Sequence, residues 1–315
     1  MPKLINLIAS ACVVACSSPN GNAVVDAPSG DHAADAAADA TTIADARGSG
    51  SGSGSATTYG FACAGNSMQP TTISSTVAVT GSAGSLDTDL TSLLALQFIT
   101  PYAGPVDLCN DEPCTSTNLL GSAASNGSGD FSFTLATNNA PVAGYVEIPA
   151  AGSGSAATLP TLSYIGTPYV KDAAVPFTVL APQAAIDAIA QNAGAECTVG
   201  SGYGFVAYKA VDCDGNVITD SVNVHGSLTQ NAAPVGDAPI DVYQAIASAL
   251  ASAGYSQFDS YAAPLEGIFI SCGVPAGETT LSVTYSGVGS DVDFLPVTVL
   301  SVGSAATEVA VQPGY

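Results

Sequence analysis

Short runs rich in β-branched and aromatic residues, separated by Gly, Pro, Asn and Asp, continue from Thr58 to the end of the 315-residue chain. In residues 130–135, Asp-Phe-Ser-Phe-Thr-Leu, the apolar side chains lie two apart, which predicts a strand with one buried and one solvent-exposed face. Regularly spaced strands with turn residues between them indicate sandwiches or small barrels, not the βαβ units of a nucleotide-binding fold. The expected strands are residues 73–80, 93–99, 131–136, 144–148, 203–211, 217–224, 267–272, 279–285, 293–300 and 307–311.

Two segments in the second half of the chain have a helical pattern. Residues 182–194 begin with Pro and end with Gly, the usual order of residues at the two ends of a helix. Residues 239–253 have an apolar face, and Asp237 is the expected N-cap. We expect both helices to pack on sheets; the alternative is that a helix forms the edge of a binding site.

The composition divides the chain into a tail and a folded part. Residues 16–58 contain an Ala/Asp/Thr tract and a Gly/Ser repeat, neither of which buries enough apolar surface to offset the entropy of ordering, so we expect a disordered tether. The remainder is longer than one sandwich usually needs, and its two halves share short similar segments. The fold class that follows is all-β, with two tandem antiparallel β-sandwiches at 59–170 and 171–315 and two short helical insertions.

The amino end has the pattern of a secretory signal. Lys3 precedes a short apolar run that ends in Ala15-Cys16, and this run is too short to span a bilayer. The segment Val13-Val14-Ala15-Cys16 resembles the bacterial lipobox, which implies removal of residues 1–15 and acylation of Cys16, so that acyl chains would hold the protein to a membrane. Ser17 then favours the outer membrane of a Gram-negative bacterium. An ordinary secretory signal with a chance cysteine is the alternative.

The charge balance excludes one class of partner. Four basic residues stand against 26 acidic ones, a formal net charge of −22. Affinity for nucleic acid depends on Lys and Arg that displace counterions, so the chain is not expected to bind nucleic acid.

The cysteines fit an oxidising compartment. With Cys12 in the signal and Cys16 acylated, an even number remains, and these are disulfide candidates. Six cysteines allow fifteen pairings. A zinc site is the weaker alternative, because no histidine lies near the close pair. The pairs that we expect are Cys109 with Cys114, Cys213 with Cys272, and Cys63 with Cys197.

Several turn segments resemble a known family. Residues 208–218 contain a strand that ends in an Asp-x-x-Gly turn, and residues 274–277 read Val-Pro-Ala-Gly; shorter matches occur at 126–134 and 141–149. These segments resemble the carboxypeptidase regulatory-like domain, a transthyretin-like β-sandwich. The resemblance implies the sandwich fold and no catalytic role, since the zinc peptidase to which that domain is sometimes attached is missing. The chain departs from the family in its helical insertion and its extra cysteines.

The turn at residues 212–216 has two interpretations. Asp214-Gly215 supplies positive φ angles at low cost, so two strands can reverse there. The side chains of Asp212, Asp214 and Asn216 are spaced as calcium ligands often are, but Val217 stands where a calcium loop needs its turning Gly. We therefore favour the structural turn and expect no metal.

The sequence offers little catalytic machinery. A Ser-His-Asp arrangement would have to use His225, and no G-x-S-x-G turn lies near it. The glycine-rich residues 200–204 lead into a strand, whereas a phosphate loop needs a following helix. We predict a chain that is not an enzyme and needs no cofactor. The glutamates that a glycosidase would need are expected in solvated positions on turns or strand faces: Glu112, Glu147, Glu196, Glu266, Glu278 and Glu308.

These observations favour a lipid-anchored, non-catalytic cell-envelope protein whose β-sandwiches bind a glycan, matrix or another envelope protein. A structural spacer or surface coat is the alternative, and a hydrolase with an unfamiliar carboxylate pair ranks last. A binding module should carry a cluster of aromatic side chains, whereas a spacer should not. Four aromatic residues that flank one loop are the candidates, although they are also placed to cap the core: Tyr243, Tyr255, Phe258 and Tyr261.

Overall fold

The computed structural model describes most of the chain after the expected tether, and these residues belong to one compact unit, Ala40–Tyr315. The predictions for the signal peptide, Cys16, most of the tether and three of the four aromatic candidates, Tyr255, Phe258 and Tyr261, lie outside the described residues. No helix in the described part combines the length and apolar character needed to cross a bilayer. The described residues are 43–44, 58–65, 72–86, 99–154, 157–175, 178–252, 265–287 and 291–314.

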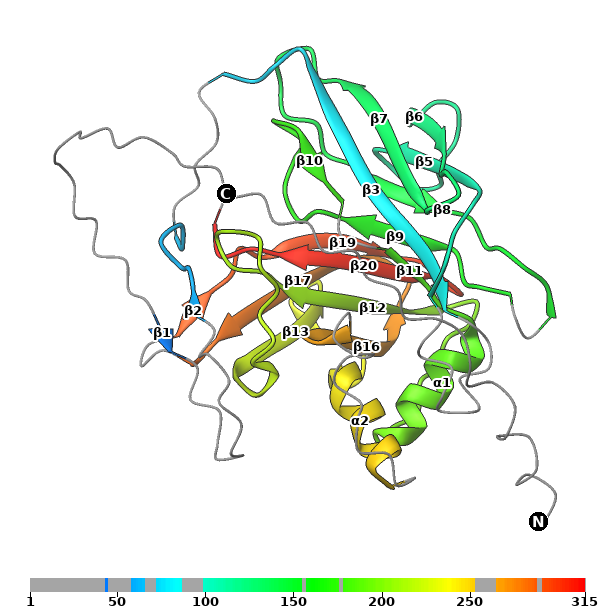
Figure 1. The fold of residues 1–315 in the computed structure, drawn as a ribbon, viewed down its shortest axis with the longest axis vertical. Coiled ribbons are helices and arrows are strands. Elements are labelled where there is room, and N and C mark those ends of the chain that lie inside the picture. Colours follow the sequence, from blue (N-terminus) through cyan, green and yellow to red (C-terminus); the bar gives the residue numbers. More distant parts are fainter. Residues whose placement is uncertain are drawn as a thin grey trace, which may run out of the picture. The chain divides into compact units, whose positions relative to one another are not determined.

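An eight-stranded sheet contains strands from both halves of the chain. Its last strand in sequence, β20, pairs in parallel with β12 on one side and with β9 on the other (Figure 1). The C-terminal strand therefore joins the two groups of strands into one sheet. Across the sheet the order is β15 (Ile240–Asp241), β16 (Ile268–Pro275), β12 (Tyr203–Ala210), β20 (Ala306–Val311), β9 (Thr161–Tyr164), β8 (Tyr145–Ile148), β5 (Pro105–Cys109) and β6 (Leu119–Ala124).

A second sheet is built around the long strand β3. The expected alternation holds in β7, where Phe131, Phe133 and Leu135 are buried against the core between this sheet and β5 and β8. Two of its strands come after residue 170, so strands past the expected domain boundary still pair with the first half, and the boundary itself stays a prediction. The strands are β3 (Thr76–Leu86), which pairs with β4 (Ile99–Pro101), β7 (Asp130–Ala136), β10 (Ala173–Ala174) and β11 (Thr178–Leu180).

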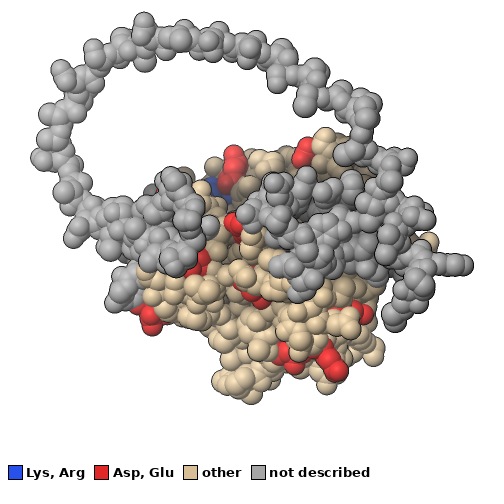
Figure 2. Space-filling view, turned by 60° about the horizontal axis from the view of Figure 1, so that its bottom comes forward, with Lys and Arg blue, Asp and Glu red and all other residues tan. Residues whose placement is uncertain are grey.

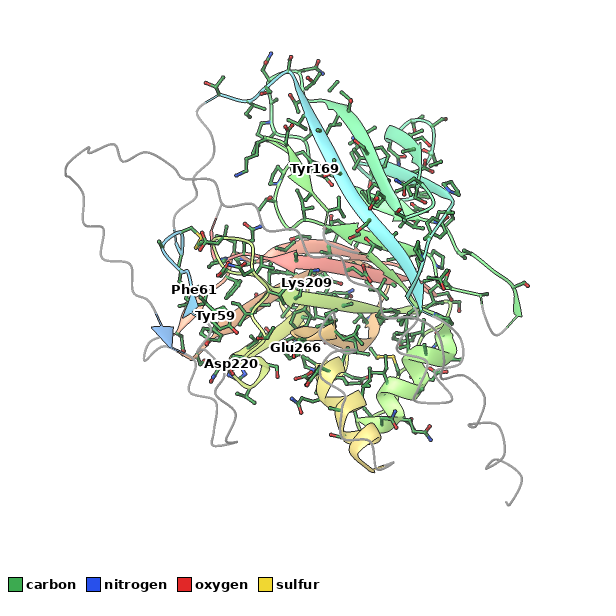
Figure 3. The ribbon with its side chains drawn as sticks, viewed as in Figure 1. Tyr59, Phe61, Tyr169, Lys209, Asp220 and Glu266 are labelled. Atoms are coloured by element: carbon green, nitrogen blue, oxygen red, sulfur yellow. A yellow bond between two sulfur atoms is a disulfide. The ribbon has the colours of Figure 1, made fainter. Side chains whose placement is uncertain are left out.

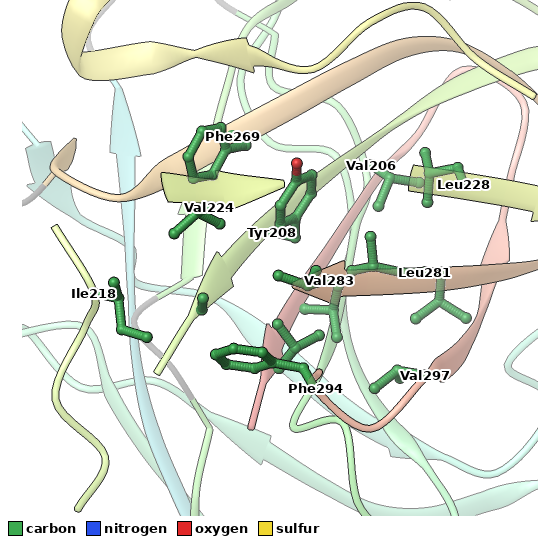
Figure 4. Close-up of a cluster of buried hydrophobic side chains, with 14 of the residues drawn as sticks. Val206, Tyr208, Ile218, Val224, Leu228, Phe269, Leu281, Val283, Phe294 and Val297 are labelled. Atoms are coloured by element: carbon green, nitrogen blue, oxygen red, sulfur yellow. The ribbon is translucent and has the colours of Figure 1, made fainter. Parts of the chain in front are cut away.

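A third sheet covers one face of the C-terminal part of the large sheet. Val206 and Tyr208 of β12 pack there against Leu281 and Val283 of β17 (Figure 4). Tyr208 stacks on Phe269 with ring centroids 5.2 Å apart. The strands are β13 (Val224–Gln230), β14 (Ala233–Pro234), β17 (Gly277–Tyr285), β18 (Val292–Asp293) and β19 (Val297–Ser301); a separate pair is formed by β1 (Ile43–Ala44) and β2 (Thr58–Tyr59).

The two helices, α1 (Gln183–Asn192) and α2 (Val242–Ser252), cover the opposite face of β12 and β16. Successive strand residues point to opposite faces. Phe205 and Ala207 therefore pack against the helices, while Val206 and Tyr208 face the third sheet. Because both faces are covered, β12 is apolar almost throughout, as expected of a strand buried on two sides.

The N-cap expected at Asp237 is wrong. Its backbone N–H donates instead to the carbonyl oxygen of Cys272 at 2.8 Å. The chain pairs with β16 as strand β15 before the helix begins, and this delays the helix start to Val242. The side chain of Asp241 accepts a hydrogen bond from the backbone N–H of Gln244 at 3.0 Å and so caps the first turn.

The expected strand at residues 217–224 is also wrong. Val217 forms an isolated bridge with Val211, and Ile218 turns into the core of the third sheet. The chain then passes through a short 3-10 turn before β13 begins at Val224. Most of the expected strand at 93–99 lies outside the described residues.

The six cysteines form three disulfides: Cys63 with Cys213, Cys109 with Cys114, and Cys197 with Cys272. The close pair is the one that we expected. The expected pairs Cys213 with Cys272 and Cys63 with Cys197 are wrong, because Cys213, in the turn after β12, and Cys272, on β16, have different neighbours.

Local packing explains the two disulfides that differ from the prediction. Cys272 lies on the helix-covered face of β16, where Cys197 packs after α1. Tyr59 is buried in the core of the third sheet, and this packing brings residues 58–65 to the turn after β12, so Cys63 meets Cys213 with their Cα atoms 5.7 Å apart.

Candidate functional site

An apolar cavity lies where the helices, the large sheet and the end of β3 meet. Its volume is about 70 Å³, and it opens to the solvent through a mouth. This space exceeds what a single water needs. Apolar side chains make up most of its wall: Leu86, Val179, Ala181, Ile186, Ile189, Phe205, Ala207, Val242, Leu265, Ile268 and Ile270.

Two charged side chains, Lys209 and Glu308, also line this cavity. The sheet register places Glu308 of β20 directly beside Ala207 on β12 and Ser163 on β9. Lys209 lies on β12 (Figure 3), two residues beyond Ala207. Because side chains alternate along a strand, it projects from the same face of β12 as the apolar wall. The pleat of two parallel strands therefore brings an acid and a base together at positions where the alternation otherwise places apolar residues.

Glu308 is held at the cavity by the neighbouring sheet. The backbone N–H of Val179 in β11 donates to both carboxyl oxygens, at 3.2 and 3.3 Å. Burial raises the pKa of Glu308 to about 8, against the lowering effects of the Val179 hydrogen bond and the Lys209 charge. The expectation that Glu308 is a solvated strand residue is wrong, because β11 covers its carboxyl group.

The same apolar environment shifts the pKa of Lys209 in the opposite direction. Burial lowers the pKa of its ammonium group, and the nearby Glu308 charge partly restores it. In the part of the chain that the structure describes, this ammonium group makes no hydrogen bond. Chemically, the cavity offers an apolar wall with one carboxyl group and one amine, which suits the binding of a small apolar molecule that carries a polar head.

The turn after β12 uses the weak calcium candidates as structural residues. The side chain of Asp212 accepts hydrogen bonds from the backbone N–H groups of Gly60, Asp214 and Asn216 at 2.9 to 3.1 Å. Gly215 has a φ of +85°, as the turn requires. The Asp212 oxygens thus face N–H donors. Among the described residues no group of three or more potential ligands is arranged to hold a metal ion.

Only one of the four aromatic candidates lies in the described residues. Tyr243 is half-buried on the first turn of α2, next to the cavity residue Val242. The aromatic patch as a whole therefore stays a prediction. His225, the residue that a catalytic triad would need, is exposed on β13.

Three acidic residues gather on the other face of β5 and β8. Asp107 and Glu147 are direct neighbours in the register, and Glu112 accepts a hydrogen bond from the Tyr145 hydroxyl at 2.9 Å. Burial raises the pKa of Glu147, and the Glu112 and Asp107 charges raise it further. Elsewhere, on the face seen in Figure 2, acidic side chains are scattered among uncharged ones. An acidic cluster of this kind does not by itself define a site.

The comparisons with known proteins add structural likeness only. No family model matches the chain, and no curated protein matches it. Among solved structures, it is similar to the shaft pilin SpaA from Lactobacillus rhamnosus GG, at 12% identity and a TM-score of 0.22, covering 76% of this chain and 98% of the pilin. The minor pilin GBS52 of Streptococcus agalactiae gives 13% identity and a TM-score of 0.23, covering 76% and 95%.

A third similar structure is the pilus backbone protein of Streptococcus pneumoniae, at 10% identity and a TM-score of 0.21, covering 80% of this chain and 68% of that protein. At these scores the likeness carries no argument about the fold or the function of this chain. The fold class rests on the strands of this chain itself, which form several β-sheets with two short helices.

Proposed function

We propose that this chain is an exported, lipid-anchored and non-catalytic envelope protein whose folded part binds a small apolar molecule in the cavity between the helices and the large sheet. The observation that carries the proposal is the cavity itself, with its apolar wall and its acid and base side by side. Ligand sites are commonly apolar hollows with a few polar groups that fix orientation.

Export is supported by the cysteines. All six cysteines in the described residues are in disulfides, which form and persist in oxidising compartments. The lipobox-like segment ending at Cys16 supplies the proposed anchor, and its acyl chains would be the contact with the outer membrane. A glycan or envelope-protein partner remains a separate prediction that depends on the aromatic candidates.

The cavity favours binding over the spacer and hydrolase alternatives. A spacer gains nothing from two ionisable side chains in an apolar cavity, since well-packed apolar side chains of similar volume are often as stable or more so. A glycosidase needs two carboxyl groups across a polar cleft, whereas one carboxyl group and one amine line this apolar cavity.

The binding proposal is tested by calorimetric titration of the full chain with 1-octanol, a neutral apolar probe. We expect saturable binding at one site. The variant Ala207→Leu adds volume to the cavity wall and should abolish this binding, while Ala276→Leu at the exposed corner between β16 and β17 should leave it unchanged. Circular dichroism checks that both variants fold. Absence of saturable binding, or equal binding by the Ala207 variant, would contradict the proposal.

Anchoring is tested independently by feeding expressing cells an alkyne analogue of palmitate. The chain should incorporate the label and fractionate with membranes, and Cys16→Ala should do neither. A wild-type chain that stays unlabelled in the culture medium would refute the anchor.

A further inference from the structure

The head group that the cavity recognises can be argued from its two charged residues. Lys209 is one of four basic residues in a chain with 26 acidic ones, yet it lies on the interior strand β12 and is only partly exposed. Burial of a charge is costly unless it is paired and hydrogen-bonded. Its position among the apolar residues of the wall therefore calls for a partner.

The protein provides hydrogen-bond partners for the carboxyl group of Glu308 but not for the ammonium group of Lys209 among the described residues. Both carboxyl oxygens of Glu308 receive the N–H of Val179. The ammonium group of Lys209 has three donors and, within the described residues, no hydrogen-bond acceptor. An acceptor is therefore what the cavity lacks, and a negatively charged acceptor would suit the ammonium group best.

We infer that the ligand is a monocarboxylate with a short apolar tail, whose carboxylate meets Lys209 and Glu308 while the tail lies along the wall formed by Ile186, Phe205 and Ile270. This inference rests on the proposed function, because it assigns the head group of the same ligand. The space in the cavity matches a tail of a few carbon atoms, and a longer tail would extend through the mouth.

The state of Glu308 supports a carboxylate ligand. Burial raises the pKa of Glu308 to about 8, which favours the protonated carboxyl group at neutral pH, and a protonated carboxyl group can donate a hydrogen bond. Lys209 then supplies a positive charge next to an O–H donor. A carboxylate accepts from both, whereas an alkyl amine would meet a like charge and a sugar would leave most of its hydroxyl groups without partners against the apolar wall.

The experiment compares three probes of equal length, octanoate, 1-octanol and octylamine, by calorimetric titration of the full chain at neutral pH. We expect octanoate to bind about tenfold more tightly than 1-octanol, as one charge-assisted hydrogen bond would provide, and octylamine to bind most weakly. Equal affinity for octanoate and 1-octanol, or preference for octylamine, would overturn the inference and leave the apolar binding site intact. Failure of all three probes to bind would overturn the proposed function as well.

Variants locate the head group. Lys209→Met replaces the ammonium group by an apolar end of similar length, so the preference for octanoate should disappear while 1-octanol affinity stays within about threefold. Lys171→Met is the matched control, since Lys171 is exposed and does not line the cavity, and it should behave as wild type. Retained 1-octanol binding shows that the Lys209 variant is folded. Octanoate preference in that variant would refute the assignment.

Discussion

The raised pKa of Glu308 makes the stability of the fold depend on pH in a defined direction. Its pKa rises from an ordinary value of 4.5 to about 8 on folding, so the folded chain holds this proton more tightly than the unfolded chain does. Between these two pH values folding takes up a proton, and raising the pH therefore lowers the free energy of unfolding. The contribution is fully present below pH 4.5 and is lost once the pH passes about 8.

The size of this effect follows from the shift. Each unit of pKa corresponds to about 1.4 kcal/mol, so the full shift sets an upper limit of about 5 kcal/mol. Because the side chain of Glu308 keeps part of its surface exposed, we expect about half of this, roughly 2 to 3 kcal/mol. The variant Glu308→Gln keeps the shape of the protonated group and cannot ionise. Near pH 5 it should match wild type, and near pH 9 it should be more stable by this amount.

The assay is urea unfolding followed by circular dichroism, at pH values from 5 to 9, for wild type, Glu308→Gln and the control Glu278→Gln. Glu278 is exposed on β17, so its replacement should leave the pH dependence as it is in wild type. Glu147, whose pKa is also raised, contributes equally to all three proteins and cancels in the differences. If Glu308→Gln shows the same slope with pH as wild type, the carboxyl group is not buried as argued.

Three further variants and one control test the packing of the third sheet and of the turn after β12, each by urea unfolding. Gly226→Ala should destabilise the fold by about 1 to 3 kcal/mol, because a Cβ at this position would overlap the ring of Tyr208. The control Gly127→Ala meets no neighbour and should change the stability by less than about 0.5 kcal/mol. Asp212→Ala should cost about 2 to 4 kcal/mol, since it removes the acceptor for the N–H groups of the turn; a neutral result would show that water replaces it. Replacing Cys63 and Cys213 together by Ala should cost about 3 to 5 kcal/mol, because the bridge closes a loop of 150 residues, and unchanged stability would contradict this.

The sequence predicts those elements best whose local pattern agrees with their final environment. Strand β7 alternates strictly and has one buried face, and it forms within one residue of the expected range. Helix α1 has Pro before it and Gly shortly after it, and it also forms as expected. Strands β5, β6 and β9 were not expected, because they are short and contain Pro, Gly or Ser. Their strand conformation depends on pairing within the large sheet, which a local pattern does not reveal.

The candidate site illustrates the same limit. Lys209 and Glu308 each stand alone in an apolar strand, and a lone charge in such a run is the only signal that the sequence carries. The signal becomes meaningful only once β12 and β20, separated by almost a hundred residues, are known to be parallel neighbours. The two wrong disulfide predictions have the same cause. Cys272 meets Cys197 because the helices cover that face of β16, and a local pattern in the sequence does not reveal which layer covers a strand.

The position of β20 explains why the cavity belongs to both halves of the chain. Its neighbour β9 and the covering strand β11 come from one group of strands, and its other neighbour β12 carries the helix-covered face of the other. Glu308 on β20 receives its hydrogen bond from the first group and its charge partner from the second. If the two sandwiches only followed one another along the chain, the Glu308 carboxyl group and the Lys209 ammonium group would each lie on a solvent-exposed edge. The acid, the base and the apolar wall meet because the last strand closes the sheet between them, so a ligand in this cavity would stabilise the joined fold and not either half alone.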